Sequence, residues 1–371
     1  MKKIIKFVTW PTIAGLLVAL IILDRFILPR DTGISGRGVE TSSYAPAVHL
    51  ASPSVVNIYT AKLVTARYNP LLNDRFIRRY PSAQNQRQRV ERSLGSGVIM
   101  SNEGYILTNN HLIAGADAIQ VLLHDGRSSR AIVVGADQAT DLAVLKIQLP
   151  KLQAIEPGHP NSARVGDIVL AIGNPLGFGH TVTQGIVSAL GRYGLQANTY
   201  ENYIQTDATI HQGNSGGALI DTRGRLLGIN TLTFTPGAQA SSGLSASGIS
   251  LAIPVDIALF VMQDLIDYGE VIRGWLGVRV NPVQKADSGN PLNQALIVAA
   301  VGRGSPAAKA GIELGDIITH IDNEAVRDGR MAMHHIALLR PGESIAITVE
   351  RNQQSIDLHA VVGTLAQSGV N

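Results

Sequence analysis

The stretch GNSGGALIDTRGRLLGIN, residues 213–230, decides which fold the chain adopts. Glycines on both sides of Ser215 let the backbone turn tightly and expose a serine hydroxyl. The backbone N–H groups of Gly213, Asn214 and Ser215 are the expected donors to a developing oxyanion. The same letters satisfy the G-x-S-x-G elbow of the α/β hydrolases, in which a helix follows the serine. Residues 218–230 instead indicate a strand, a turn and a second strand, so the pattern favours a β fold.

Two upstream segments supply the groups that a serine hydroxyl needs to become a nucleophile. His111 ends the strand-like segment TNNH (108–111), and Asp141 opens the strand-like segment DLAVLK (141–146). The order His, Asp, Ser matches the chymotrypsin-type double barrel, whereas the histidine comes last in the α/β hydrolases. In that arrangement His111 takes the proton from Ser215, and Asp141 fixes the tautomer of His111.

Other residues could compete for these roles. His211 lies four residues before Ser215, but it shares the nucleophile's loop and cannot easily approach from the side opposite the oxyanion donors. Asp137 is the rival acid, and the strand that follows Asp141 favours the latter. The pair His334–His335 resembles a metal pair, but no H-E-x-x-H pattern accompanies it, so we expect surface histidines on a helix. We therefore expect no metal and no cofactor.

The composition fits a β-rich chain. It has 371 residues with 38 Gly, only 16% charged residues, a net charge of +3 and no Cys. The small net charge argues against a nucleic-acid binder, and the absence of Cys excludes disulfides and thiol catalysis. Short β-branched runs separated by turns predict a mainly β chain, with a first clear helix over 255–267.

The N-terminus predicts a membrane anchor. Three lysines within the first six residues flank an uncharged apolar run from Phe7 to Leu23. This run is close to the roughly 17–25 residues that span a bilayer. No small-residue cleavage pattern follows, so we expect an uncleaved anchor rather than a cleaved signal peptide. The lysines place the tip in the cytoplasm and the rest of the chain on the other side of the membrane. We assign residues 1–28 to the tip and anchor and 29–45 to a tether.

Residues 66–92 form a polar stretch with seven Arg and two acids. We interpret it as a solvated insertion, with a docking or regulatory loop as the alternative. The residues expected to line the specificity pocket, 209–212 and 230–234, include no acid. We therefore expect no trypsin-like preference for basic residues. Instead we expect a small or medium apolar residue at P1, the substrate position just before the cleaved bond.

Several segments resemble the motifs of the HtrA family of serine proteases. This resemblance covers roughly residues 47–363 and implies a serine endopeptidase with an acyl-enzyme mechanism. It also implies a chymotrypsin-like double β-barrel protease domain over 46–272. The matching segments are TNNH (108–111), TDLAVLK (140–146), GNSGGAL (213–219), QTDA (205–208) and AIGNP (171–175).

The segment after residue 273 resembles a PDZ domain, an α+β fold that binds a peptide C-terminus as an added strand beside a helix. We assign it to 273–365, followed by a tail over 366–371; a small β domain that only packs on the protease is the alternative. The resemblance rests on GSPAA (304–308), AGI (310–312) and GDII (315–318). The residues expected to bind the peptide are Trp275, Leu276, Gly277 and Val278 in the carboxylate loop, with Met333 or Ile336 on a helix over 330–339.

A single PDZ domain behind an uncleaved anchor resembles the DegS/AlgW branch of the family. This branch implies a homotrimer in the inner membrane, with the protease and PDZ domains in the periplasm. Its PDZ domain senses the C-termini of misfolded outer-membrane proteins, and its protease then cuts a membrane anti-sigma factor of the RseA/MucA type in the envelope stress response. The resemblance also implies that the loop at 190–192 relays the PDZ state to the oxyanion loop, with Arg192 as the candidate switch.

Two alternatives to this function stay open. One is a broad quality-control protease of the DegP/DegQ type, and the longer insertion at 66–92 is similar to that type. The other is a peptide-binding sensor in which proteolysis is vestigial, against which the complete set of His111, Asp141 and Ser215 argues.

Overall fold

The computed structural model divides the chain into two units, 1–45 and 46–371. It describes residues 15–16, 18–19, 43–65, 88–159, 162–174, 179–193, 200–211, 213–233, 249–284, 294–326 and 328–364. Over these residues, none of the helices combines the length and the hydropathy needed to cross a bilayer. Most of the expected anchor and tether lies outside the described residues.

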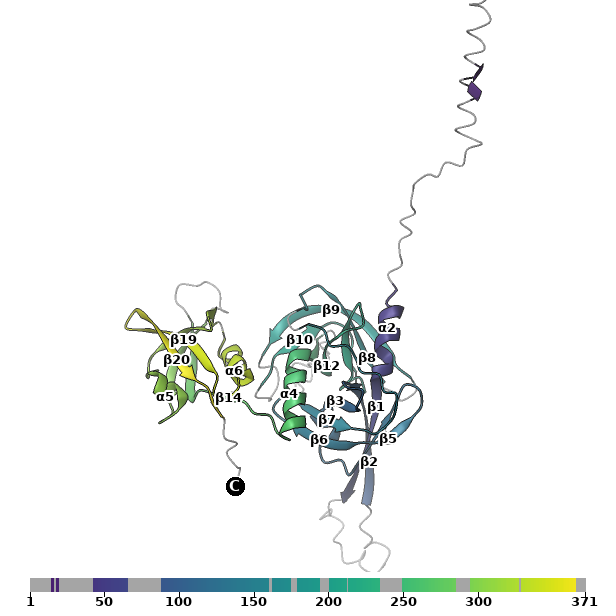
Figure 1. The fold of residues 1–371 in the computed structure, drawn as a ribbon, viewed down its shortest axis with the longest axis horizontal. Coiled ribbons are helices and arrows are strands. Elements are labelled where there is room, and N and C mark those ends of the chain that lie inside the picture. The colour runs from purple at the N-terminus through teal and green to yellow at the C-terminus, as the bar shows by residue number, and fades with distance from the viewer. Residues whose placement is uncertain are drawn as a thin grey trace, which may run out of the picture. The chain divides into compact units, whose positions relative to one another are not determined.

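The second unit begins with a seven-stranded antiparallel sheet in the order β5-β4-β1-β2-β3-β7-β6 (Figure 1). Fully buried Ile58, Ile106 and Leu145 belong to its core. It is preceded by α2 (Ala45–Ala51) and the 3-10 turn η2 (Ser52–Ser54). Its strands are β1 (Val55–Thr65), β2 (Gln88–Ile99), β3 (Tyr105–Asn109), β4 (Ala118–Leu122), β5 (Ser128–Arg130), β6 (Ile132–Asp137) and β7 (Leu142–Lys146).

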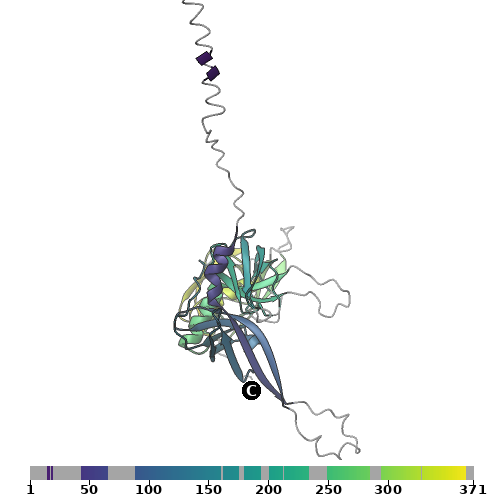
Figure 2. The same cartoon turned by 90° about the vertical axis from the view of Figure 1, so that its right-hand side faces the viewer.

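Strands β1 and β2 form a ribbon that extends beyond the other strands (Figures 1 and 2). They pair without interruption from Val55 opposite Val98 to Thr65 opposite Gln88. Residues 88–92, which we expected to belong to a polar loop, are therefore part of a strand. The rest of the expected loop lies outside the described residues.

The chain then forms a closed barrel in the order β10-β13-β12-β11-β8-β9. The helix α4 (Val255–Asp267) follows it, which confirms the helix predicted over these residues. α4 packs on β6 and β7 of the first sheet and on β12 and β13 of the barrel. The barrel strands are β8 (Ile168–Gly173), β9 (Thr181–Arg192), β10 (Tyr203–Thr206), β11 (Ala218–Asp221), β12 (Leu226–Thr233) and β13 (Ser250–Pro254).

Beyond α4 the chain forms a smaller α+β domain with its own core, to which Leu296, Ile318 and Ile347 belong. Its α5 (Pro306–Ala310) begins at Ser305, whose side chain accepts a hydrogen bond from the Ala308 N–H, and ends at Gly311 in the left-handed region. The GSPAA motif is thus a capped helix start. α6 (Gly329–Leu338) lies one residue earlier than predicted. The strands are β14 (Gly274–Trp275), β15 (Val278–Gln284), β16 (Gln294–Val301), β17 (Ile317–Ile321), β18 (Glu324–Ala325), β19 (Ser344–Arg351), β20 (Gln354–Val361) and β21 (Gly363–Thr364).

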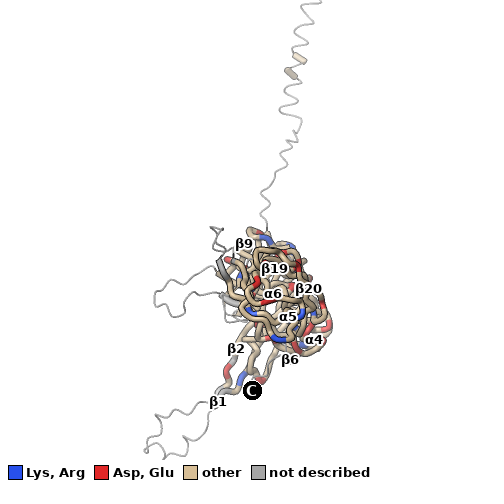
Figure 3. The backbone as a smooth tube through the Cα atoms, turned by 90° about the vertical axis from the view of Figure 1, so that its left-hand side faces the viewer, with Lys and Arg blue, Asp and Glu red and all other residues tan. Residues whose placement is uncertain are grey.

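Acidic and basic residues are interspersed along the described part of the chain (Figure 3). The charges are therefore mixed rather than sorted by sign. Most of the described elements are strands. The prediction of a mainly β chain is confirmed.

Candidate active site

The first two site residues are brought together by the pairing of β3 with β7. Asn109 and Leu142 face each other in this antiparallel pair. His111 lies just past the end of β3, on the single turn α3 (Asn110–Ile113), and Asp141 immediately precedes β7. Residues far apart in the sequence therefore meet at one end of the sheet.

The contact between His111 and Asp141 is direct. His111 Nδ1 lies 2.7 Å from Asp141 Oδ2, and the His111 backbone N–H donates to Asp141 Oδ1 at 2.9 Å. Asp141 is 7% exposed and has a φ of 59°, a conformation that non-glycine residues rarely adopt. Its carbonyl accepts from Asn109 Nδ2 at 3.1 Å and from the Asn110 N–H at 3.0 Å, which helps to hold this backbone in place. A histidine bound at Nδ1 has its Nε2 left for proton transfer.

Ser215 lies on the loop that enters β11 and is 7% exposed. Its hydroxyl donates to the carbonyl of Thr231 on β12 at 2.6 Å, so its proton is directed at the backbone rather than at His111. The Thr231 hydroxyl in turn donates to Asp141 Oδ2 at 3.2 Å. Thr231 therefore contacts both Ser215 and Asp141. From the sequence, Thr231 was expected only among the pocket-lining residues 230–234, and its contacts with Ser215 and Asp141 were not predicted.

The loop also fixes the expected oxyanion donors. Gly213 has a φ of 99°, in the region that favours glycine. The Asn214 N–H donates to the His211 carbonyl at 3.0 Å, within the loop itself. In this conformation Asn214 is thus not directed at a substrate, and Gly213 and Ser215 stay the predicted donors.

The rival acid Asp137 has other partners. Its Oδ2 accepts from the Thr140 backbone N–H at 3.0 Å, from the Thr140 hydroxyl at 2.5 Å and from Arg273 Nη2 at 2.5 Å. Asp137 thereby joins the turn before Asp141 to the segment that enters the C-terminal domain.

The residues expected to bind a peptide terminus are also gathered together. Leu276 is buried, Trp275 is 37% exposed, and Gly277 has a φ of 78°. A Cβ on Gly274 would lie 2.3 Å from the Ile336 carbonyl, so β14 runs directly against α6. Met333, on the same helix, is 37% exposed. The predicted carboxylate loop therefore lies beside the predicted groove helix.

The histidine pair on α6 differs from expectation. His335 is partly exposed and lies 2.9 Å from Asp322 Oδ2, but His334 is buried. Its Nε2 is 3.3 Å from Asn202 Nδ2, and its ring meets Tyr193 edge-on at 6.4 Å between centroids. Burial lowers the pKa of His334. In the described part of the chain, no three His, Cys, Asp or Glu side chains are grouped as a metal site would require.

Among the described residues, three polar contacts join the C-terminal domain to the protease domain: His334 with Asn202, Arg273 with Asp137, and Arg340 with Asp264. Arg273 also lies over the ring of Tyr200, and Arg340 over the ring of Phe260. The candidate switch Arg192 ends β9, where its Nε donates to Gln205 Oε1 at 2.8 Å. It therefore contacts its own barrel, while its neighbour Tyr193 contacts α6.

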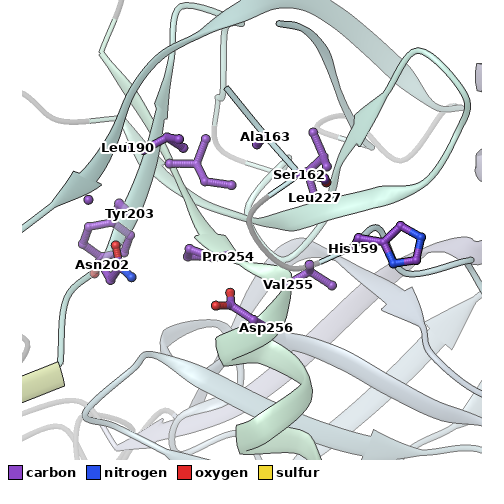
Figure 4. A pocket seen from close by; sticks show the side chains of 12 residues that line it. His159, Ser162, Ala163, Leu190, Asn202, Tyr203, Leu227, Pro254, Val255 and Asp256 are labelled. Atoms are coloured by element: carbon purple, nitrogen blue, oxygen red, sulfur yellow. The ribbon is translucent and has the colours of Figure 1, made fainter. Parts of the chain in front are cut away.

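A cavity of about 160 Å³ opens on the barrel beside Leu190 and the start of α4 (Figure 4). Asn202, Tyr203 and Asp256 belong to its lining. None of His111, Asp141 and Ser215 lines it. The catalytic assignment therefore rests on side-chain geometry and not on this cavity.

The sequence matches two protein families, a trypsin-like peptidase domain over residues 95–229 and a PDZ domain over residues 274–362. It is 40% identical over 367 residues to the serine endoprotease DegS of Escherichia coli, covering 97% of each chain. A probable periplasmic serine endoprotease, DegP-like, from Brucella suis is 44% identical over 276 residues, which are 73% of this chain and 52% of that protein.

Solved structures of proteases are also similar to this chain. The HtrA-type protease AlgW with a decapeptide is 48% identical, with a TM-score of 0.66 over 87% of this chain and 98% of that one. A serine endoprotease from Yersinia pestis is 40% identical, with a TM-score of 0.59 over 87% of this chain and 98% of that one.

Proposed function

The chain belongs to the HtrA family of serine endoproteases, and we propose that it cleaves peptide bonds with Ser215 as nucleophile, His111 as general base and Asp141 as the orienting acid. It is a serine endopeptidase with one PDZ domain, of the regulated DegS/AlgW type. The observation that carries the residue assignment is the 2.7 Å contact between His111 Nδ1 and Asp141 Oδ2, next to a serine loop of GNSGG sequence.

In the proposed mechanism, Ser215 Oγ forms a bond to the substrate carbonyl carbon while its proton passes to His111 Nε2. The carbonyl oxygen becomes an oxyanion that the Gly213 and Ser215 N–H groups stabilise. The C–N bond then breaks, and His111 returns the proton to the leaving amine. A water molecule then attacks the carbonyl carbon of the acyl-enzyme while His111 takes its proton. The bond to Ser215 Oγ breaks, His111 returns the proton to Ser215, and the acyl group leaves as a carboxylic acid. Before the first of these steps, the Ser215 hydroxyl must leave the Thr231 carbonyl, to which it donates in the structure.

Regulation is proposed to act through α6. This helix carries Met333 and Ile336, the expected groove residues, and also His334, which contacts Asn202 and Tyr193. A peptide C-terminus bound beside Trp275–Val278 would press on the same helix that contacts the segment following Arg192. Binding and catalysis can therefore be linked through one rigid element.

We further propose that the protein works as a membrane-anchored homotrimer in the periplasm. Its ligands are the C-termini of misfolded outer-membrane proteins, and its substrate is a membrane anti-sigma factor. Support comes from the apolar run at Phe7–Leu23 and from the similarity to DegS along 97% of the chain. A broad quality-control protease is the second candidate, supported by the identity to the DegP-like relative.

The regulated protease and the quality-control protease differ in the substrate that they cut and in whether cleavage requires a bound peptide. The protein is incubated with casein and with the periplasmic part of an anti-sigma factor, each with and without a hydrophobic C-terminal peptide. The regulated protease is expected to cut the anti-sigma factor only when peptide is present. Rapid digestion of casein without peptide would contradict it and favour the quality-control protease.

A further inference from the structure

Ser96, on β2, lies directly behind the nucleophile loop and is fully buried. It stands between Gly95 and Gly97, in the sequence LGSGV (94–98). A Cβ on Gly216 would lie 2.1 Å from the Ser96 carbonyl oxygen, so this strand and the loop are in contact through their backbones. The strand therefore packs directly against the nucleophile loop, with no side chain between the Ser96 carbonyl and Gly216.

Two hydrogen bonds run from Ser96 to the loop. Its hydroxyl donates to the Gly213 carbonyl at 2.5 Å, and its backbone N–H donates to the Ser215 carbonyl at 2.9 Å. The first bond holds the peptide group between residues 213 and 214, and the second holds that between 215 and 216. The peptide group between them carries the Ser215 N–H, one of the two predicted oxyanion donors. Ser96 therefore fixes the backbone on both sides of this donor.

A third hydrogen bond orients the hydroxyl. The Asn174 N–H donates to Ser96 Oγ at 3.0 Å, at the end of β8. Because a hydroxyl has one proton, accepting from Asn174 leaves that proton for the Gly213 carbonyl. The Ser96 carbonyl accepts from the Thr108 hydroxyl at 2.8 Å, which anchors the strand next to His111.

We propose that Ser96 is a positioning residue for catalysis, whose hydroxyl holds the oxyanion-forming N–H of Ser215 in place. This inference rests on the proposed role of Ser215 as nucleophile. Ser96→Ala would leave the Gly213 carbonyl and the Asn174 N–H without their partner in a buried site, and the loop would move to find others. The loss is expected in transition-state stabilisation, because substrate binding does not require the oxyanion donor.

The test compares the purified full-length Ser96→Ala, Ser96→Thr and native proteins on the labelled periplasmic part of an anti-sigma factor, the proposed substrate, with saturating C-terminal peptide. A rigid donor lost from an oxyanion hole costs about 10²–10³-fold in kcat, so a misplaced one should cost about 10–100-fold. We expect this loss in Ser96→Ala with KM within about two-fold of native, and a rise of the same factor in the Ki of a peptide aldehyde. Ser96→Thr keeps the hydroxyl and should recover most of kcat.

Two controls make the outcome specific. Ser54→Ala removes another fully buried serine hydroxyl, which has no hydrogen-bond partner in the described structure, and should leave kcat unchanged. Labelling with a fluorophosphonate, followed by peptide mapping, reports the nucleophile itself. A label on a residue other than Ser215 would refute the proposed catalytic assignment, whereas a label on Ser215 at the native rate in Ser96→Ala would refute only the role of Ser96.

The role of Ser96 is also refuted if kcat of Ser96→Ala stays within two-fold of native, or if its fall is matched by an equal rise in KM. If Ser96→Ala does not fold, as judged by circular dichroism, Ser96→Cys takes its place. Its thiol is a weaker donor than the hydroxyl, so the same loss of kcat and the same refuting outcomes apply.

Discussion

The ion pair between Arg340 and Asp264 offers a quantitative test of how the C-terminal domain is held. Asp264 lies on α4 with its side chain fully buried, and Arg340 Nη2 is 2.6 Å from its Oδ1. Oδ2 accepts from Arg340 Nη1 at 2.8 Å and from the Ile272 N–H at 2.9 Å. Arg340→Met removes the guanidinium, which also lies over the Phe260 ring, and leaves the Ile272 N–H as the one remaining donor to the carboxylate among the described residues.

Removing one partner of a buried pair typically costs about 3–5 kcal/mol. The Arg340 side chain is 38% exposed, so water can reach the carboxylate once the guanidinium is gone. We therefore expect Arg340→Met to lower the free energy of unfolding by about 2–3 kcal/mol. The exposed pair of Arg164 with Asp167 is the matched control, and Arg164→Met should cost less than about 1 kcal/mol.

The assay is urea unfolding followed by circular dichroism, with Asp264→Asn and the double variant completing the cycle. The two single changes should be coupled by more than about 1 kcal/mol, because residues in one network are not additive. A loss below about 0.5 kcal/mol for Arg340→Met, or additive single variants, would show that this pair does not hold the domain.

Two further predictions concern the catalytic contacts and pH. Thr231→Val removes the hydroxyl that donates to Asp141. Loss of this hydrogen bond, worth about 1 kcal/mol, should lower kcat about five-fold in steady-state kinetics. An unchanged kcat would mean that this contact is dispensable. Burial lowers the pKa of His334 in the folded protein, so the unfolded chain binds more protons and stability should fall as the pH drops below about 6.5. His334→Gln should make this decline shallower in urea unfolding between pH 7 and 5, and an unchanged slope would assign the pH dependence to other groups.

The sequence predicts those parts of the site that depend on local order. His111 and Asp141 were identified because each adjoins an apolar strand, and the antiparallel pairing of these strands brings them together. The helix over 255–267 follows from apolar residues at helical spacing. Such features need only a few consecutive residues and are visible without a structure.

Contacts between distant segments could not be predicted in the same way. Thr231 meets Asp141 across 90 residues, and Asp137 meets Arg273 across 136. The burial of His334 depends on how α6 packs on the protease, which its own helix does not reveal. A polar side chain has the same letter whether it is solvated or holds a catalytic loop, so these roles appear only in three dimensions.

The most direct test of the catalytic assignment is peptide-bond cleavage by Ser215→Ala in the presence of a saturating C-terminal peptide, with binding of that peptide followed by fluorescence anisotropy. The assignment predicts that cleavage disappears, while the peptide binds with native affinity because its expected site lies in the other domain. Cleavage that continues at a rate near that of the native protein would show that another group is the nucleophile.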